Sequence, residues 1–298
     1  MNKPTITAAV LTKDDEKNLP LCLERLGWVD DLVVVDSGSS DKTLEIAKQF
    51  KARIFINNPE KFIHADQRNW VLDHAGIKTD WIMNVDPDEI ITEKLKEKIL
   101  ASIAGAGQDV SAFLVCSKLM LQQTWLKHSV GFPLWHDKLY RFGEVRFKGG
   151  VWEKFDTKGK VEKIAEPFLH FPFKKGIGPW IDKHQCYAKF WAEQLMLQNS
   201  YSLLDLIKVL FFPHQEGKKT KTLQAFSVSV ISISPFLRFF YHYFFKLGFL
   251  DGKGGFLFAR MMAHYQFMIY LYYREAKENA KCLRLKNTEN ITLSRKSQ

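Results

Sequence analysis

Short apolar runs alternate with helical patterns over the first hundred residues of the chain. Runs rich in β-branched and aromatic residues predict buried strands at Thr5–Leu11, Leu32–Asp36, Arg53–Asn57 and Trp81–Asp86. Between and after them, apolar residues three and four positions apart predict helices at Asp15–Leu26, Asp41–Phe50, Ala65–Ala75 and Thr92–Ile103. Strands that alternate with short helices predict an α/β fold, with a mostly parallel sheet and helices on both faces.

Polar and acidic residues follow three of these predicted strands. The first strand is followed by TKDDEKN, the second ends in DSGSSDKT and the fourth in DPDE. Ligands of parallel sheets bind at the carboxyl ends of the strands, so these groups are expected to converge on one edge. Asp36 with Ser37–Ser39 predicts a tight turn whose N–H and hydroxyl groups suit a ribose or a base, although Asp-Ser-Gly also forms ordinary loops.

Asp86 and Asp88 stand one residue apart, with Pro87 stiffening the chain between them. Two carboxylates at this position can bind a hard divalent cation, Mg²⁺ or Mn²⁺, which keeps open positions for phosphate oxygens. Such a metal would neutralise a diphosphate leaving group. The alternative is that both aspartates cap the helix that begins near Thr92.

Composition bounds the class of protein. With 298 residues, 46% of them hydrophobic, the chain can bury a substantial core. The four cysteines show no C-x-x-C pair and no secretory signal is present, which favours a reducing cytosol without disulfides or structural zinc. Residues 1–170 contain 24 basic and 25 acidic residues, whereas residues 171–298 contain 19 and 8. The excess positive charge therefore predicts an anionic partner for the second part of the chain.

Three segments together carry a family resemblance. The sequence from Thr5 to Phe50, the stretch ADQRNWVLDHA and the stretch DWIMNVDPDEI resemble family 2 glycosyltransferases with the Rossmann-like GT-A fold. More narrowly, they resemble bacterial lipopolysaccharide inner-core enzymes that transfer glucose to heptose. The resemblance covers about residues 4–200 and implies an inverting transferase that uses a nucleotide-activated sugar and a divalent metal.

The resemblance also implies roles for particular residues. It implies that Asp36 meets the uridine ribose or base, and that Asp86 and Asp88 form the metal-binding D-x-D motif. The residues implied to line the nucleotide pocket or to lie beside the base or diphosphate are Thr12, Asp14, Glu16, Gln67, Arg68 and Asn69.

An inverting transfer needs a base that removes the proton from the acceptor hydroxyl. In RFKGGVWEKFD we assign this role to Glu153, with Asp137 and Glu144 as the next candidates. The resembling enzymes usually have His-Glu where this chain has Trp152-Glu153, and Trp152 is a candidate for stacking on the acceptor sugar.

Weaker assignments concern three further places. Arg141 could contact the diphosphate or be a solvated edge residue, and His170 could reach the metal or a phosphate or be structural. The segment Ser117–Gly131 is expected to form a loop or hairpin over the donor site.

The last third of the chain has a different character. A soft boundary falls near Asn199–Ser200, which divides a catalytic domain (1–200) from a helical region (201–280) and a basic, disordered tail (281–298). Phe226–Tyr273 is dense in aromatics but has no uncharged apolar run of spanning length. It predicts two helices in the membrane interface, with Lys174, Lys175, Lys218, Lys219, Lys221, Arg238 and Arg260 near anionic headgroups. The alternative is a helical hairpin packed on the catalytic domain or on a second copy.

These observations favour a peripheral glycosyltransferase on the cytoplasmic face of the bacterial inner membrane. It would move a hexose from a UDP-sugar to a glycolipid, a lipopolysaccharide core sugar being the expectation from the resemblance. A sugar nucleotidyltransferase would be expected to carry a glycine-rich, basic phosphate loop where this chain has LTKDDEKN. A nucleic-acid binder is disfavoured because the basic residues alternate with long apolar runs.

Overall fold

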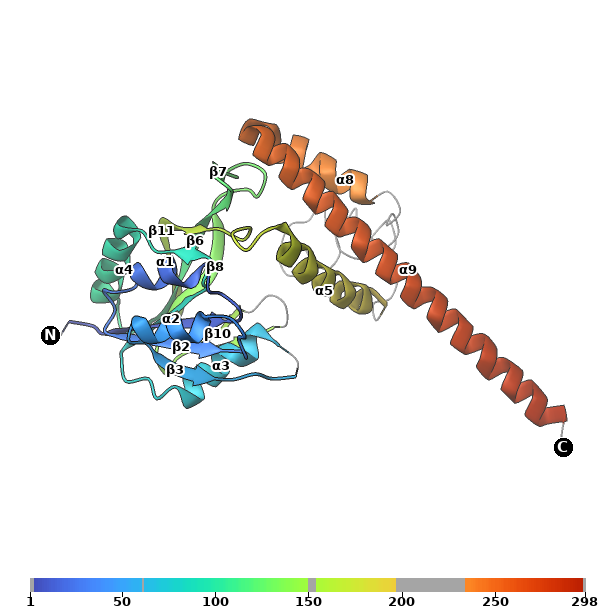
Figure 1. Ribbon diagram of the computed structural model, residues 1–298, viewed down its shortest axis with the longest axis horizontal. Helices are drawn as coiled ribbons and strands as arrows, with labels where there is room; N and C mark the ends of the chain where they lie inside the picture. Colours follow the sequence, from blue (N-terminus) through green and yellow to red (C-terminus); the bar gives the residue numbers. More distant parts are fainter. Residues whose placement is uncertain (1–2, 61, 150–153, 197–233, 297–298) are drawn as a thin grey trace. The chain divides into compact units, whose positions relative to one another are not determined.

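The computed structural model describes residues 3–60, 62–149, 154–196 and 234–296 (Figure 1). The chain forms two compact units, Met1–Ile177 and Gly178–Gln298. The division falls at the start of a helix, whereas the change in composition had placed the boundary near Asn199–Ser200.

The first half of the first unit has the alternation that the sequence predicts. Each expected strand and helix is present within a few residues of its expected bounds. The strands are β1 (Ile6–Thr12), β2 (Asp31–Asp36), β3 (Arg53–Ile56) and β4 (Trp81–Val85), and the helices are α1 (Leu19–Glu24), α2 (Thr43–Gln49), α3 (His64–His74) and α4 (Glu93–Gly105). All pairings among these four strands are parallel, so their carboxyl ends share one edge.

The second half of this unit departs from the parallel pattern. Its strands are β5 (Glu89–Ile90), β6 (Val110–Leu121), β7 (Thr124–Trp125), β8 (Leu134–Arg141), β9 (Arg146–Lys148), β10 (Lys154–Asp156) and β11 (Lys160–His170). The main sheet has the order β3-β2-β1-β4-β8-β6-β11-β5, and β8 is antiparallel to both of its neighbours. A mostly parallel sheet is therefore correct for the first half only. Within Ser117–Gly131, β7 pairs with the end of β6 as a hairpin.

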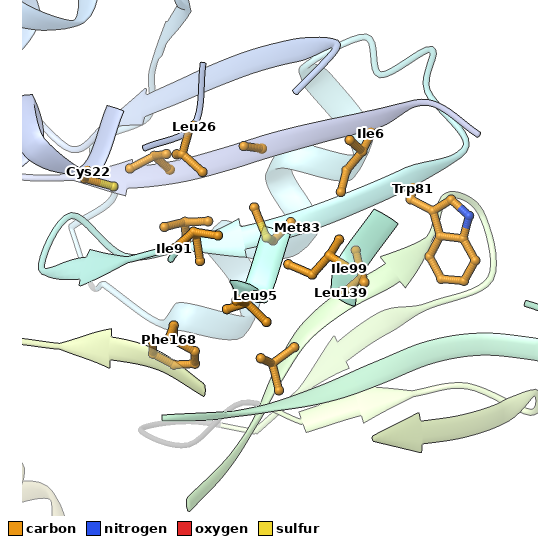
Figure 2. Packing of buried hydrophobic residues seen from close by; sticks show 14 of the residues in the cluster. Ile6, Cys22, Leu26, Trp81, Met83, Ile91, Leu95, Ile99, Leu139 and Phe168 are labelled. Atoms are coloured by element: carbon orange, nitrogen blue, oxygen red, sulfur yellow. The ribbon is translucent and has the colours of Figure 1, made fainter. Parts of the chain in front are cut away.

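Apolar side chains cover both faces of the sheet. On one face, residues of β1, β4 and β8 pack against α1 and α4, including Ile6, Met83, Leu95 and Ile99 (Figure 2). On the other face, Val33 and Tyr140 pack with Val71 of α3 and Phe147 of β9. The sheet is thus the middle of three layers, as its near-continuous apolar strands predict.

Strand β11 contains an irregularity near its carboxyl end. It pairs in parallel with β6, but Ile164 faces Val115 while Phe168 faces Ser117. Three residues of β11 thus lie opposite one residue of β6, and Pro167 is among them. A bulge accommodates a proline, which cannot donate a ladder hydrogen bond.

The second unit is helical. It comprises α5 (Ile177–Met196), which begins at the boundary, then α8 (Ser234–Phe240), a π-helical turn η1 (Tyr241–Phe245), a 3₁₀ turn η2 (Gly248–Asp251) and α9 (Gly252–Lys296). Helices α5 and α9 pack through Ala188, Leu195 and Ile269. None of the helices in the described ranges has both the length and the apolar character needed to cross a bilayer.

The tail predicted to be disordered is helical in the structure. Helix α9 continues to Lys296. After Gly255 the sequence has no proline or glycine, and residues that favour helices are frequent, so nothing in the chain ends the helix earlier.

Candidate functional site

The turn after β2 is built around Asp36, which is fully buried at the carboxyl edge of the sheet. Its carboxylate accepts hydrogen bonds from the backbone N–H groups of Gly38 (2.9 Å) and Ser39 (2.7 Å) and from the Thr12 hydroxyl (3.0 Å). Thr12 and Asp36 are therefore brought together as the sequence predicts. The N–H groups of Gly38 and Ser39, however, donate to Asp36 itself, so the Asp36 carboxylate stabilises the turn through these hydrogen bonds.

Asp14 and Glu16 connect the loops after β1 and β2. Asp14 accepts hydrogen bonds from the backbone N–H (2.7 Å) and hydroxyl (3.1 Å) of Ser40, and Glu16 accepts one from the N–H of Lys42 (3.2 Å). The two loops form one rim of the carboxyl edge. In this structure both carboxylates hold the rim together.

Helix α3 contributes three consecutive residues with separate roles. Gln67 is buried and accepts a hydrogen bond from the side-chain amide of Asn57 (3.0 Å), while Asn69 exchanges two hydrogen bonds of 3.0 Å with the backbone of Phe147. Arg68 is buried and donates to Asp86 Oδ1 at 2.6 Å. Arg68 thus lies at the predicted site, and its two neighbours fix α3 to the surrounding segments.

Asp86 is held by two cations. Arg68 Nη2 lies 2.6 Å from Oδ1, and Lys138 Nζ lies 3.4 Å from Oδ2. Burial opposes the charge of Asp86, but Lys138 and Arg68 outweigh it and hold the pKa of this carboxyl well below its ordinary value. Both carboxylate oxygens of Asp86 face cations in this structure, which fixes the side chain at the start of the turn that follows β4. The role of Asp86 as a metal ligand in the D-x-D motif stays a prediction.

Glu89 and Lys138 form a buried ion pair beneath this turn. Lys138 Nζ lies 2.7 Å from Glu89 Oε2, and the two side chains are only 9% and 2% exposed. Glu89 also accepts a hydrogen bond from the backbone N–H of Asp86 (3.0 Å). Burial raises the pKa of Glu89 to about 7, against the opposing charge of Lys138. Sequence reasoning assigned no role to either residue. The available signal was a lysine in the middle of the strand LWHDKLYR, since a lysine in a central strand is seldom buried unless it is paired.

Asp88 lies next to His170. Strand β5 pairs with the end of β11 so that His170 faces Glu89, and the imidazole Nε2 lies 3.4 Å from Asp88 Oδ2. Burial lowers the pKa of His170, but the negative charge of Asp88 outweighs burial and raises it. Helix α4 is capped by Thr92, whose hydroxyl accepts the N–H of Leu95 (3.2 Å). The alternative in which the aspartates cap this helix is therefore wrong.

The Asp88–His170 pair fits a divalent cation. Adjacent ligands about 2.1 Å from an octahedral ion lie about 3 Å apart, close to the separation observed here. A carboxylate oxygen suits either Mg²⁺ or Mn²⁺. An imidazole nitrogen as the second ligand favours Mn²⁺. Within the described ranges no group of three or more His, Cys, Asp or Glu side chains is arranged as a metal site.

Arg141 lies at the other edge of the sheet. It faces Trp81, the first residue of β4, and its guanidinium stacks on the indole at 4.5 Å and donates to the carbonyl oxygens of Val110 and Gly107. A strand rises about 3.3 Å per residue, so the length of β4 separates Arg141 from Asp86. The prediction that Arg141 contacts the diphosphate is therefore wrong, and Lys138 is the basic residue of β8 that reaches the site.

The base and acceptor candidates Glu153 and Trp152 lie outside the described residues. Of the two further candidates, Glu144 accepts the Ser111 hydroxyl at the edge of the sheet where Arg141 lies. Asp137 accepts the backbone N–H of Phe155. Asp137 thus anchors the chain just after Glu153, whereas Glu144 is remote from the Asp86–Asp88 turn.

A second lysine, Lys175, lies at the rim formed by the loops after β1 and β2. Lys175 Nζ lies 2.6 Å from Asp15 Oδ1 and donates to the carbonyl oxygen of Lys13 at 3.0 Å. The sequence placed Lys175 among residues near lipid headgroups, but its charge is paired in the first unit. Burial raises the pKa of Asp15, and Lys175 counteracts this shift.

Comparison with known proteins identifies the class. The sequence model of the family described as Glycosyl transferase family 2 matches residues 7–152, just under half of the chain. A glycosyltransferase of Rickettsia felis whose activity is uncharacterized is 24% identical over 95% of this chain and 92% of its own length. The lipopolysaccharide core biosynthesis glycosyltransferase LpsC of Rhizobium meliloti is 25% identical over 39% of this chain and 43% of its own.

Two solved structures are also similar to the chain. TarS of S. aureus (residues 1–349) covers 93% of this chain and 91% of its own, with a TM-score of 0.42 and 16% identity. Glucosyl-3-phosphoglycerate synthase of Mycobacterium tuberculosis, solved with Mn²⁺, UDP and glucosyl-3-phosphoglycerate, covers 56% of this chain and 72% of its own, with a TM-score of 0.40 and 16% identity.

The family match and the full-length relatives define the class of the protein. It is an enzyme, a glycosyltransferase, and its residues 7–152 are similar to the sequence model of family 2.

Proposed function

We propose that this glycosyltransferase moves a hexose, glucose being the first expectation, from a UDP-sugar to a membrane glycolipid with inversion at the anomeric carbon. The observation that carries the donor half of this proposal is the Asp88–His170 pair at the carboxyl edge of β4. This edge is where parallel α/β sheets bind their ligands. A divalent cation held there by Asp88 and His170 would supply charge neutralisation for the departing diphosphate.

The protein's own residues keep this site in one geometry. Arg68 and Lys138 neutralise Asp86, so the charge offered to a ligand at the turn is that of Asp88. Glu89 fixes the backbone N–H of Asp86. A turn held at both ends in this way orients Asp88 without reorganisation during turnover, which favours catalysis by preorganised charges.

The proposed base remains Glu153, two residues before Phe155. The hydrogen bond from Phe155 N–H to Asp137 ties this part of the chain to β8, the strand that also carries Lys138. A carboxylate near this anchor would take the proton from the acceptor hydroxyl as the oxygen attacks the anomeric carbon. Trp152 remains the candidate for stacking on the acceptor sugar.

The acceptor half rests on similarity and on the second unit. The similarity to LpsC supports an acceptor in the lipopolysaccharide core. The exposed aromatic and basic residues of the second unit support work at an anionic membrane surface. We therefore place the enzyme at the cytoplasmic face of the bacterial inner membrane as a peripheral protein.

Donor binding can be tested without any acceptor. UDP-glucose, UDP-galactose, GDP-mannose and ADP-glucose would each be added with and without Mn²⁺, and the melting temperature recorded for the wild type, Asp88→Asn and His170→Ala. Asp73→Asn serves as the matched control, because Asp73 is a carboxylate paired with Arg146 outside the site. We expect metal-dependent stabilisation by UDP compounds in the wild type and in the control, and its loss in the two site variants.

Two results would contradict the proposal. Equal stabilisation with and without metal, retained in Asp88→Asn, would remove the metal assignment. Stabilisation by GDP-mannose or ADP-glucose in place of the UDP-sugars would keep the site and change the donor.

A further inference from the structure

The end of the helical unit exposes large apolar side chains at an unusual density. Phe245 is 79% exposed, Phe236 70% and Leu250 56%. The exposed large residues of α8, η1 and η2 include Phe236, Phe240, Phe244, Phe245, Phe249 and Leu250. We call this set the aromatic tip. Scattered exposed apolar residues are normal, but these six exposed large apolar side chains between positions 236 and 250 indicate an interaction surface.

The tip is held by a tight turn rather than by a flexible loop. Gly248 and Gly255 approach so closely that a Cβ atom at Gly255 would overlap the carbonyl oxygen of Gly248. Asp251, Phe258 and Ala259 are buried behind the tip. The apolar side chains are thus presented on a fixed backbone, and ordering them against a partner costs little further entropy.

Basic residues surround the aromatic tip. Lys246 lies within it, and Lys253 and Arg260 are exposed on the first turns of α9. Asp251, the one acidic residue between Ser234 and Tyr273, is 9% exposed. Over the described residues 234–273, the surface of the tip and of the first turns of α9 is therefore apolar and positive, with no exposed acidic side chain.

We propose that the aromatic tip inserts into the interfacial region of an anionic lipid bilayer while Lys246, Lys253 and Arg260 contact lipid headgroups. This inference deepens the proposed function, on which it rests for the glycolipid acceptor, by assigning membrane contact to one end of the helical unit. Aromatic side chains with basic neighbours match the two layers of a bilayer surface, apolar beneath and anionic above.

The positive charge around the aromatic tip favours an anionic bilayer over a second copy of the chain as its partner. In a symmetric dimer through the tip, each copy would present the same patch to the other. Lys246, Lys253 and Arg260 of both copies would then approach one another, and the described residues 234–273 offer them no exposed acidic partner. An anionic bilayer supplies the missing charge.

The experiment measures co-sedimentation of the full-length protein with vesicles in the absence of donor and acceptor. The vesicles contain phosphatidylethanolamine with phosphatidylglycerol, and phosphatidylcholine vesicles show the contribution of charge. The variants are Phe245→Ser, Leu250→Ser, their combination, and Lys246→Gln/Lys253→Gln. Ile56→Ser in the first unit is the matched control, because Ile56 and Leu250 are equally exposed (57% and 56%).

Each apolar substitution is expected to lower the vesicle partition coefficient on the order of tenfold, and the combination about a hundredfold. The double lysine substitution is expected to lower it about 25-fold on anionic vesicles, about fivefold for each lysine. Ile56→Ser should bind as the wild type does. Undiminished sedimentation of Phe245→Ser/Leu250→Ser would overturn the proposal, as would a wild-type dimer that dissociates in this variant while vesicle binding persists.

A second measurement gives a new signal on binding, so a loss of binding caused by misfolding cannot be mistaken for a result. An environment-sensitive fluorophore would be attached to Phe245→Cys or, as the comparison, Ile56→Cys, in a chain with Cys186→Ser and Cys282→Ser. A blue shift with anionic vesicles at position 245 alone supports insertion, and no shift at position 245 refutes it. Metal-dependent stabilisation by UDP-sugars is measured separately on the same variants, so a failure of the tip and a failure of the donor site give different results.

Discussion

Replacing Lys138 by methionine would test whether the buried ion pair holds the Asp86–Asp88 turn. Methionine keeps the length of the side chain and removes its charge. Glu89 would then retain only the N–H of Asp86 as a hydrogen-bond donor, and Asp86 would retain Arg68. Both ends of the turn are thus affected by one substitution.

The expected loss follows from burial and distance. Removing one partner from a buried pair typically costs about 3–5 kcal/mol. Here the side chains are 9% and 2% exposed, and Nζ lies 2.7 Å from Oε2, so the pair is of this kind. Glu89 already has a pKa raised to about 7 and can take up a proton when Lys138 is lost. We therefore expect a loss near the low end, about 3 kcal/mol in the free energy of unfolding at pH 8.

The assay is urea unfolding followed by circular dichroism for Lys138→Met, Glu89→Gln and the double variant. Glu89→Gln removes the uncompensated charge and leaves an oxygen for the Asp86 N–H, so the double variant should recover about 2 kcal/mol relative to the sum of the single losses. Lys96→Met is the control: Lys96 pairs with Glu93 at 3.1 Å, but the side chains are 30% and 64% exposed. It should lose less than about 0.5 kcal/mol. Additive losses in the double variant, or a loss at Lys138 no larger than at Lys96, would refute the reasoning.

Three further predictions concern separate parts of the first unit. Gly38→Ala should lower the free energy of unfolding by about 1–3 kcal/mol, measured in urea against Gly27→Ala, because Gly38 has φ +82° and a Cβ there would lie 2.7 Å from Asn58 Nδ2. Burial lowers the pKa of His136 to about 3, below the unfolded value of about 6.5, so the unfolded chain binds the additional proton and stability falls as pH drops below about 6.5. About 1–2 kcal/mol should be lost between pH 7 and pH 5, and His136→Asn should abolish this part of the loss. Glu153→Gln should lower kcat on the order of a hundredfold or more with little change in donor binding, and an equal loss of binding in a nucleotide titration would assign it a structural role.

The first four strands and helices could be predicted because their signals are local. The apolar runs of β1, β2 and β4 are buried by helices of the same half of the unit, and Ile54 and Phe55 of β3 are half-buried against them. The Asp86–Asp88 turn follows directly from the end of β4. Parallel alternation of this kind leaves few topologies, so the edge at which Thr12, Asp36 and Asp88 lie could also be predicted.

The second half of the site depends on pairings that are distant in the sequence. Lys138 and Arg141 are three residues apart on β8, yet only Lys138 reaches Asp86, because Arg141 pairs with the first residue of β4. The sequence near Arg141 carries no sign of this register. The partners of Glu89 were likewise fixed by the order β4-β8-β6-β11, which local patterns do not encode.

The bulge in β11 makes the length of this segment as important as its composition. Between the pairs Ile164–Val115 and Phe168–Ser117, β11 has two residues more than β6. Deleting two residues would keep the alternation of side chains between faces but draw His170 back by about 7 Å along the strand, away from Asp88. A single insertion or deletion would turn His170 to the opposite face. Among related chains, the segment from Ile164 to His170 is therefore expected to tolerate substitutions more readily than changes in length.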